Sequence, residues 1–206
     1  MLLEHTYFYF KEALPLRFCN DLISYGKQQR LNLARIGSET VDFSKPLSKN
    51  QIKETKKIRN SDIVFLDDPW ILKEILPFVK EANENSNWKF QFDGVQSTQF
   101  TVYNKNQFYN WHTDSFKKPL NGKIRKLSVS VILSNKEDYQ GGDLQFDTSY
   151  DHFTNPELKK KIVTCQEANT KGSIIVFPSF VTHRVTPVTK GTRYSLVLWY
   201  TGNPFI

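Results

Sequence analysis

The stretch KLSVSVILS, residues 126–134, alternates apolar and small polar side chains with the two-residue period of a β-strand. Leu127, Val129, Val131 and Leu133 fall on one face, while Ser128 and Ser130 fall on the other. Four further segments are equally rich in β-branched and aromatic residues: TQFTVY (98–103), GDLQF (142–146), GSIIVFP (172–178) and RYSLVLWY (193–200). Short strands that follow one another without intervening helices predict a β-sandwich or jelly roll from about residue 96 onward.

The first 95 residues have a different pattern, which is mainly helical. Residues 7–10 predict a short strand, and residues 37–60 a surface loop or an irregular helix. After Pro15, apolar or small residues recur at helical spacing: Leu16, Cys19, Leu22, Ile23 and Gly26. A second helix is expected from residue 68 or 69 to about residue 85, and Pro77 inside it predicts a kink or two shorter helices. Its expected buried stripe comprises Trp70, Leu72, Ile75, Leu76 and Val79.

The length of 206 residues is that of a single domain, which we expect to consist of a helix-rich support region, 1–95, and a β region, 96–206. Aromatic side chains make up 14% of the chain, which excludes a disordered protein. The two cysteines, Cys19 and Cys165, form no CxxC pair, which argues against a disulfide scaffold and a structural zinc site. No apolar run approaches the roughly 18 residues of a membrane span, and the N-terminus has no leader pattern. We therefore expect a soluble, cytoplasmic protein without a membrane partner.

The chain carries 28 basic and 21 acidic residues, and the excess is concentrated in two segments. Residues 45–60 hold six Lys or Arg and one Glu, and residues 117–126 hold five and no acid. Such segments are commonly solvated surface loops. The same charge can attract nucleic acid or an acidic partner, so both interpretations stay open.

Three short motifs in the β region could carry chemistry. In an extended segment, residues two apart point the same way, so His112 and Asp114 can converge on one point. His183 follows another expected strand, and two histidines with one carboxylate form the facial triad that binds non-haem Fe(II). On the last strand, Arg193 shares a face with Ser195 and Trp199. A cation on the inner wall of a barrel is costly unless an anion meets it there.

Residues from about 88 to 199 resemble the 2-oxoglutarate/Fe(II)-dependent oxygenases, in the prolyl 4-hydroxylase-like branch that includes the PKHD-type hydroxylases. The matching pieces are Tyr103 leading through FYNW to His112 and Asp114, then LSVSVILS, EDYQGGDLQF, and the segment from Lys171 to Tyr200 with His183 and Arg193 ten residues apart. The resemblance implies a double-stranded β-helix, that is, a jelly-roll or cupin-like barrel with N-terminal supporting helices, of the α+β class.

By this resemblance, His112, Asp114 and His183 are the expected iron ligands, and Arg193 pairs with the far carboxylate of 2-oxoglutarate. Ser195 and Tyr103 are further expected cosubstrate contacts. The resemblance also implies dioxygen as a cosubstrate and ascorbate as a supporting reductant. Trp199 and Trp111 flank the motifs and are candidates for the substrate pocket, although core packing explains them equally well.

Three further features accompany the resemblance. Where the family often has glycine after the first motif, this chain has Asn106, and asparagine tolerates the left-handed conformation expected there. Gly141 and Gly142 are expected to form a tight turn or bulge. The basic segment 115–126 lies next to the iron motif and could contribute to a substrate lip.

The implied reaction is hydroxylation of a C–H bond, with oxidative decarboxylation of 2-oxoglutarate to succinate and carbon dioxide. The carboxylate of Asp114 favours hydroxylation, because halogenating relatives replace it with a small residue. The first expected substrate class is a peptidyl proline in a protein or peptide, by family analogy. The alternatives are a free amino acid or small metabolite, AlkB-like demethylation of nucleic acid, and a basic binding module on an inactive jelly roll. The sequence does not indicate an oligomeric state.

Overall fold

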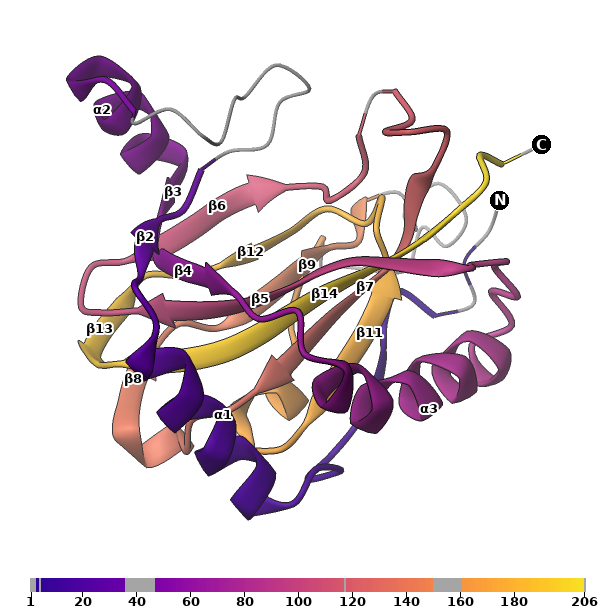
Figure 1. Ribbon diagram of the computed structural model, residues 1–206, viewed down its shortest axis with the longest axis horizontal. Coiled ribbons are helices and arrows are strands. Elements are labelled where there is room, and N and C mark those ends of the chain that lie inside the picture. Colours follow the sequence, from indigo (N-terminus) through magenta and orange to yellow (C-terminus); the bar gives the residue numbers. More distant parts are fainter. Residues whose placement is uncertain (1–2, 4, 36–46, 117, 150–160, 206) are drawn as a thin grey trace.

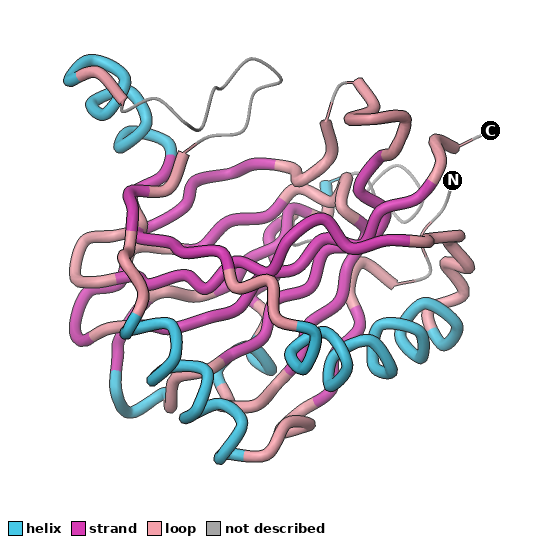
Figure 2. Tube along the Cα trace, in the orientation of Figure 1, coloured by secondary structure: helices cyan, strands magenta, loops and turns pink. Residues whose placement is uncertain are grey.

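The computed structural model describes residues 3, 5–35, 47–116, 118–149 and 161–205, and its strands form two main sheets (Figures 1 and 2). The larger sheet has seven strands in the order β1 (Phe8–Phe10), β11 (Ile174–Pro178), β7 (Ile124–Ile132), β14 (Arg193–Gly202), β5 (Gly94–Tyr103), β4 (Asp62–Phe65) and β2 (Asn32–Leu33). The smaller sheet has five, in the order β10 (Ile162–Thr164), β9 (Leu144–Asp147), β12 (His183–Val185), β6 (Phe108–His112) and β3 (Arg59–Asn60). A separate pair joins β13 (Val188–Gly191) to β8 (Tyr139–Gly141).

Side chains from both sheets meet in an inner core, as expected for a jelly roll. Ile132 and Phe177 of the larger sheet and Leu144 and Phe146 of the smaller sheet belong to one buried cluster. The Phe146 and Phe177 rings lie 5.1 Å apart in an edge-to-face arrangement. All pairings between the described strands are antiparallel, so the strands form an antiparallel sandwich that supports the expected double-stranded β-helix.

The alternation of strand β7 divides its side chains between two cores, as the sequence predicts. Leu127, Val129 and Val131 belong to the outer cluster, which lies between the larger sheet and the helices. Ser128 points the other way and hydrogen-bonds to Asp114 at the candidate site. The strand therefore supplies both a hydrophobic face for the helices and a polar face for the site.

Helices α1 (Leu16–Gln28) and α3 (Pro69–Asn85) cover the outer face of the larger sheet (Figure 1). The buried stripe of α3 differs from the expected one: it consists of Ile71, Ile75, Val79, Ala82 and Asn83. Trp70 was expected in this stripe, but it is 41% exposed and contacts Phe18 of α1 edge to face. Residues at i, i+4 and i+8 share a helix face, so burial of Ile71 turns Trp70 toward the edge. Pro77 lies inside one continuous helix and does not divide it into two.

The N-terminal region contributes strands as well as helices, which corrects the expected order of helices first and strands later. β1, β2 and β4 join the larger sheet, and β3 joins the smaller one. β2, β3 and β4 have only two to four residues, too few for a periodic pattern to show in the sequence, whereas β1 confirms the short strand predicted at residues 7–10. Helix α2 (Lys49–Ile58) begins with a capping box of Ser48 and Gln51. It carries most of the first basic segment, of which Lys45 lies outside the described residues.

Two short 3₁₀ helices, η1 (Lys136–Asp138) and η3 (Gln166–Asn169), connect strands. Within the described ranges, no helix combines the length and the apolar character needed to cross a bilayer.

Gly26 lets helix α1 approach the larger sheet closely. A Cβ built on Gly26 would lie 2.6 Å from two ring atoms of Phe100, whose side chain is fully buried on β5. The Phe100 ring is itself stacked on Tyr194, with centroids 5.9 Å apart, so it has neighbours on more than one side. The glycine in the helical pattern is therefore explained by helix–sheet contact.

We predict that Gly26→Ala lowers the free energy of unfolding. Alanine favours the helix by about 1 kcal/mol, but overpacking a core commonly costs about 1–3 kcal/mol, so the clash outweighs the helix preference. Urea unfolding monitored by circular dichroism measures the difference. Ser24→Ala, on the same helix but not fully buried, is the control and should be close to neutral. A Gly26→Ala protein more stable than the parent would contradict this packing.

Candidate metal centre

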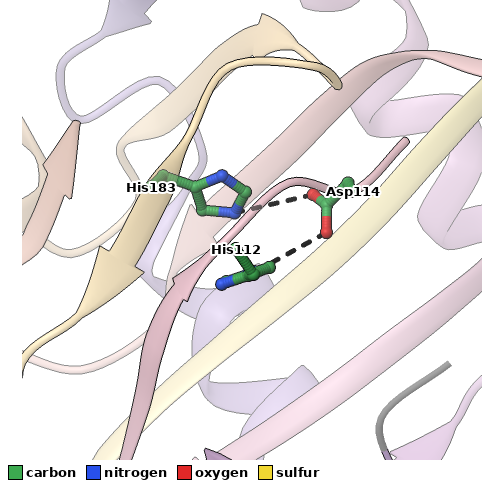
Figure 3. Close-up of side chains that lie close together, drawn as sticks. All are labelled: His112, Asp114 and His183. Atoms are coloured by element: carbon green, nitrogen blue, oxygen red, sulfur yellow. Dashed lines mark ion pairs between the residues drawn. The ribbon is translucent and has the colours of Figure 1, made fainter. Parts of the chain in front are cut away.

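The pairing of strands β6 and β12 brings the two motif histidines side by side. His112 is the last residue of β6 and His183 the first of β12, and the antiparallel register pairs them directly. Asp114 follows two residues after His112, where the main-chain N–H groups of Asp114 and Ser115 donate to the Ser179 carbonyl at 2.9 and 3.0 Å. One ligand atom from each of the three motif residues lies within 4.8 Å of the others, and the side chains point toward one another (Figure 3).

Both histidines are oriented by main-chain carbonyls two residues earlier. Nδ1 of His112 lies 2.7 Å from the Asn110 carbonyl oxygen, and Nδ1 of His183 lies 2.9 Å from that of Val181. A carbonyl oxygen only accepts hydrogen bonds, so this geometry assigns the proton of each neutral ring to Nδ1. The unprotonated Nε2 atoms then face the Asp114 carboxylate, at 3.7 Å from His112 and 3.6 Å from His183 (Figure 3).

Asp114 is buried but ionised. Burial alone would raise its pKa, but the neighbouring His183 and His112 rings, the Arg125 guanidinium and the Ser128 hydrogen bond act against burial and bring the pKa down to about 2. The hydroxyl of Ser128 donates to its Oδ2 atom at 2.7 Å, and Ser128 and Ser179 hydroxyls lie 2.9 Å apart. The carboxylate is therefore fixed in orientation by the polar face of β7.

His112 is held in its neutral form. Burial, together with the charge of His183, lowers the pKa of His112 to about 3. Its ring is stacked on Tyr109, with centroids 3.5 Å apart and planes at 11°. Neutral imidazole and ionised carboxylate are the forms that bind metal, and two imidazole nitrogens with one carboxylate oxygen are the donor set of non-haem Fe(II) sites.

The three residues line one end of a cavity of about 500 Å³, which lies within the usual range for ligand pockets. Four other residues expected from the sequence line the same cavity: Arg193, Ser195, Tyr103 and Trp199. Phe116 and Leu120 of the segment expected to form a lip also line it. Trp111 is not among the lining residues. Neighbours on a strand point to opposite faces, and Trp111 instead lies under the guanidinium of Arg184, at 4.5 Å.

Arg193 is a buried cation with unused hydrogen-bond donors. Its side chain belongs to a residue only 1% exposed, and its Nη1 donates to the Ser195 hydroxyl at 3.0 Å. Its Nε and Nη2 are buried and make no hydrogen bond to the described residues. The ring of Tyr103, which is paired with Arg193 across β5 and β14, lies 5.6 Å away. A planar guanidinium with two unpaired donors fits a carboxylate such as that of 2-oxoglutarate.

Backbone conformation at three positions supports the site. Gly141 and Gly142 have φ of 70° and 65°, and a Cβ on Gly142 would lie 2.9 Å from Cδ of Arg193. The second glycine therefore makes room for the arginine side chain. Asn106 has φ of 66°, which confirms the left-handed conformation expected for it.

Four residues around the motif side chains were not among those expected at the site from the sequence. Ser128 and Tyr109 contact these side chains, Arg125 donates to the main-chain carbonyl of Asp114, and Arg59 lies over the Tyr109 ring. The signal for Ser128 was present, because it lies on the polar face of an alternating strand. Tyr109 belongs to the aromatic stretch before His112, but stacking on the ring cannot be inferred from spacing alone. Arg59 and Arg125 lie in the two basic segments that were interpreted as solvated or partner-binding.

Comparisons with known proteins agree with this geometry. Residues 98–201 match the sequence model of the 2OG-Fe(II) oxygenase superfamily. A PKHD-type hydroxylase from Alteromonas mediterranea is 34% identical over 104 residues, which is 48% of this chain and 41% of the relative. The aligned part thus spans less than half the length of that relative.

Solved structures share the fold. A prolyl-4-hydroxylase from Pseudomonas putida superposes with a TM-score of 0.66 at 19% identity, covering 95% of this chain and 92% of the other. A prolyl hydroxylase from Trichoplax adhaerens, in complex with a peptide fragment of the hypoxia inducible factor oxygen degradation domain, has a TM-score of 0.58 at 16% identity and covers 95% and 83%. The family match spans half of the chain and contains His112, Asp114, His183 and Arg193, and the chain belongs to the 2OG-Fe(II) oxygenase superfamily.

Proposed function

We propose that this protein is an Fe(II)- and 2-oxoglutarate-dependent dioxygenase that hydroxylates a C–H bond of a peptidyl proline. One observation carries the proposal: three converging metal-ligand side chains line a cavity that is also lined by the buried guanidinium of Arg193, which has no anionic partner among the described residues. A structural metal site does not require the second feature. A cosubstrate that bears a carboxylate and chelates the metal requires both.

In this proposal, His112 and His183 bind Fe(II) through Nε2, and Asp114 binds through a carboxylate oxygen. The main-chain carbonyls of Asn110 and Val181 keep both Nε2 atoms aimed inward. Three protein ligands on one side leave positions for cosubstrate and dioxygen on the other. Ser128 keeps the carboxylate from rotating away, which is the usual task of a partner behind a metal ligand.

Arg193 binds the far carboxylate of 2-oxoglutarate through its Nε and Nη2 donors. Ser195 already accepts a hydrogen bond from Nη1, so its own hydroxyl proton remains available to donate to the same carboxylate. Tyr103 forms the adjoining wall and offers a phenolic hydroxyl. Arg193 and Ser195 lie at the start of β14 and Tyr103 ends the neighbouring strand β5, so together they fix the direction in which the cosubstrate enters the metal centre.

Bound Fe(II) and 2-oxoglutarate supply, with dioxygen, the oxidation that hydroxylates the substrate and releases succinate and carbon dioxide. The protein positions the reactants and limits water. Trp199 and Phe177 give the cavity apolar walls next to the ligands. In such a wall the charged donors of Arg193 act at low local dielectric, where a charge-assisted hydrogen bond is strong.

Peptidyl proline is proposed as the substrate because of two relationships. The chain matches PKHD-type hydroxylases in sequence, and its fold is shared with prolyl hydroxylases, one of them solved with a bound peptide. The cavity is open to a lip that contains Phe116 and Leu120, which could contact a peptide.

We predict that anaerobic addition of Fe(II) and 2-oxoglutarate to the protein produces a weak visible charge-transfer band near about 500 nm, typical of a keto acid chelated at a facial-triad iron. His183→Ala should abolish the band, because a ligand is lost. Arg193→Ala should retain it but require at least about tenfold more 2-oxoglutarate, since one charge-assisted pair is worth about 1.5–3 kcal/mol. Arg193→Lys, which keeps the charge, is the control for folding. A parent protein with neither band nor bound metal would refute the proposal.

We predict that Ser128→Ala weakens metal binding by about 10–100-fold, as is usual when the hydrogen-bond partner of a metal ligand is removed. Anaerobic Fe(II) titration by calorimetry measures the affinity. Ser130→Ala is the matched control, because Ser130 lies on the same strand and lines the same cavity. Equal loss of affinity in both variants would contradict a specific role for the Ser128 hydrogen bond.

We predict that Gly142→Ala weakens 2-oxoglutarate binding while Fe(II) binding is kept. The added Cβ would displace Arg193, which it approaches to 2.9 Å. Gly122→Ala is the control for backbone strain, because Gly122 also has a positive φ, 75°, but has no atom within 4 Å of an added Cβ. Calorimetric titration of both ligands separates the effects. Unchanged cosubstrate affinity in Gly142→Ala would show that Arg193 does not depend on this glycine.

A further inference from the structure

Three arginines besides Arg193 line the cavity: Arg35, Arg59 and Arg125. Arg59 and Arg125 line it together with the metal-ligand residues, and Arg59 is only 6% exposed. Arginine side chains are seldom buried without a partner, because removing their charge from water is costly. The hydrogen bonds of each guanidinium nitrogen therefore decide whether Arg59 and Arg125 can bind a further anion.

Arg125 is fixed at one end of the cavity. Its guanidinium lies over the rings of Trp199 and Phe116, at 3.9 and 4.5 Å from their centroids. Nε donates to the Gln96 side-chain oxygen at 2.7 Å, and Nη1 donates to the Asp114 carbonyl oxygen at 3.3 Å. Nη2 makes no hydrogen bond to any described residue, and it is not a fully enclosed atom.

Arg59 is fixed in a similar way, next to the aromatic ring that is stacked on His112. Its guanidinium lies 4.5 Å from the ring centroid of Tyr109, which is stacked on His112. Nε donates to the Ser61 hydroxyl at 3.1 Å. Both terminal nitrogens lack a hydrogen bond to the described residues. In both arginines, then, stacking and Nε hold the group while terminal nitrogens stay available.

The charges of these two groups are not balanced by the rest of the site. Among the described residues that line the cavity, Asp114 is the one carboxylate, and it faces the Nε2 atoms of both histidines. Fe(II) and the dianion of 2-oxoglutarate bring equal and opposite charges. Their binding would satisfy Arg193 without changing the excess at Arg59 and Arg125. The remaining component of the reaction is the substrate.

We infer that the substrate presents a carboxylate to Arg59 and Arg125. The inference rests on the proposed function and narrows its substrate class. Arg193 and Trp199 are six residues apart on β14, roughly 20 Å at strand spacing, so Arg125 on Trp199 and the cosubstrate arginine serve different groups. The available nitrogens lie on two separate planar guanidinium groups, and the two coplanar oxygens of one carboxylate can accept from both groups.

The carboxylate could come from an acidic residue beside the target proline or from a free amino acid. In both cases it would lie close to the reacting carbon, because Arg125 contacts Asp114 directly and Arg59 reaches His112 through Tyr109. Long basic side chains on helix α2 cannot supply this selectivity, because they are exposed to solvent.

The test uses the 206-residue chain with Fe(II) and 2-oxoglutarate under anaerobic conditions. The charge-transfer band is recorded first, because it reports whether the proposed function holds. Two matched pairs of probes are then titrated by calorimetry: a blocked proline peptide with glutamate beside the proline against its glutamine twin, and L-proline against L-prolinamide. We expect the carboxylate member of one pair to bind at least about tenfold more tightly, as for one charge-assisted hydrogen bond. Preference within the first pair indicates a peptide source, and preference within the second a free amino acid.

Variants test the assignment to the two arginines. Arg59→Gln and Arg125→Gln should each remove most of the preference for the carboxylate probe. Arg125→Lys keeps the positive charge and should retain part of this preference, so it serves as the second variant where Arg125→Gln does not fold. Lys53→Gln removes the same charge from exposed α2 and should keep the preference. Equal or undetectable binding of all probes with a normal band overturns the inference and leaves the proposed function standing. Tighter binding of a phosphoserine twin overturns the choice of carboxylate, and absence of the band overturns both proposals.

Discussion

The site depends on the register between strands β6 and β12. In an antiparallel pair, directly opposed residues have their side chains on the same face, so pairing His183 with His112 puts both imidazoles on the inner face together. A slip by one residue would turn one of them to the opposite face. The neighbouring pairing of β12 with β9, in which His183 lies opposite Phe146, holds β12 from its other side. The register of β12 is therefore fixed by pairing along both of its edges.

The larger sheet supplies the second half of the site through one strand. β14 pairs with β5 on one side and with β7 on the other over most of its length. Arg193, Ser195 and Trp199 therefore lie on a strand that is secured along both edges. Ser128 of β7 is opposite Trp199 and reaches Asp114, so the same pairing connects the cosubstrate wall to a metal ligand. Rigid strands position such groups more closely than loops can.

The sequence predicts the parts of this arrangement that are governed by period and spacing. Alternation in residues 126–134 predicts both faces of β7, and the spacing of His112 and Asp114 predicts their convergence. The shared face of Arg193, Ser195 and Trp199 follows from the same two-residue period, whereas the placement of His183 with His112 and Asp114 follows from the family resemblance. In the structure the three ligand residues converge, and Arg193, Ser195 and Trp199 line the same cavity.

The features that the sequence does not predict depend on contacts between distant segments. The face of α3 that is buried is decided by the sheet it meets, so a stripe containing Trp70 was as consistent with the sequence as one containing Ile71. β2, β3 and β4 are too short for a pattern and form because β5 and β6 offer edges. Trp111 shows that a position next to a ligand in the sequence does not place a side chain in the site, because neighbouring side chains of a strand point to opposite faces.

Arg193, Arg59 and Arg125 show how this protein keeps buried charge without an internal counter-ion. Each guanidinium donates at least one hydrogen bond from Nη1 or Nε to a neutral oxygen, and each lies near an aromatic ring that partly replaces water. These contacts stabilise a guanidinium less than an ion pair with a carboxylate would. Part of the desolvation cost of each group is therefore left uncompensated until an anion binds. An internal acid at these positions would stabilise the empty fold, but it would compete with every anionic ligand. The absence of a carboxylate other than Asp114 among the described lining residues is therefore consistent with a cavity arranged to bind charge from outside.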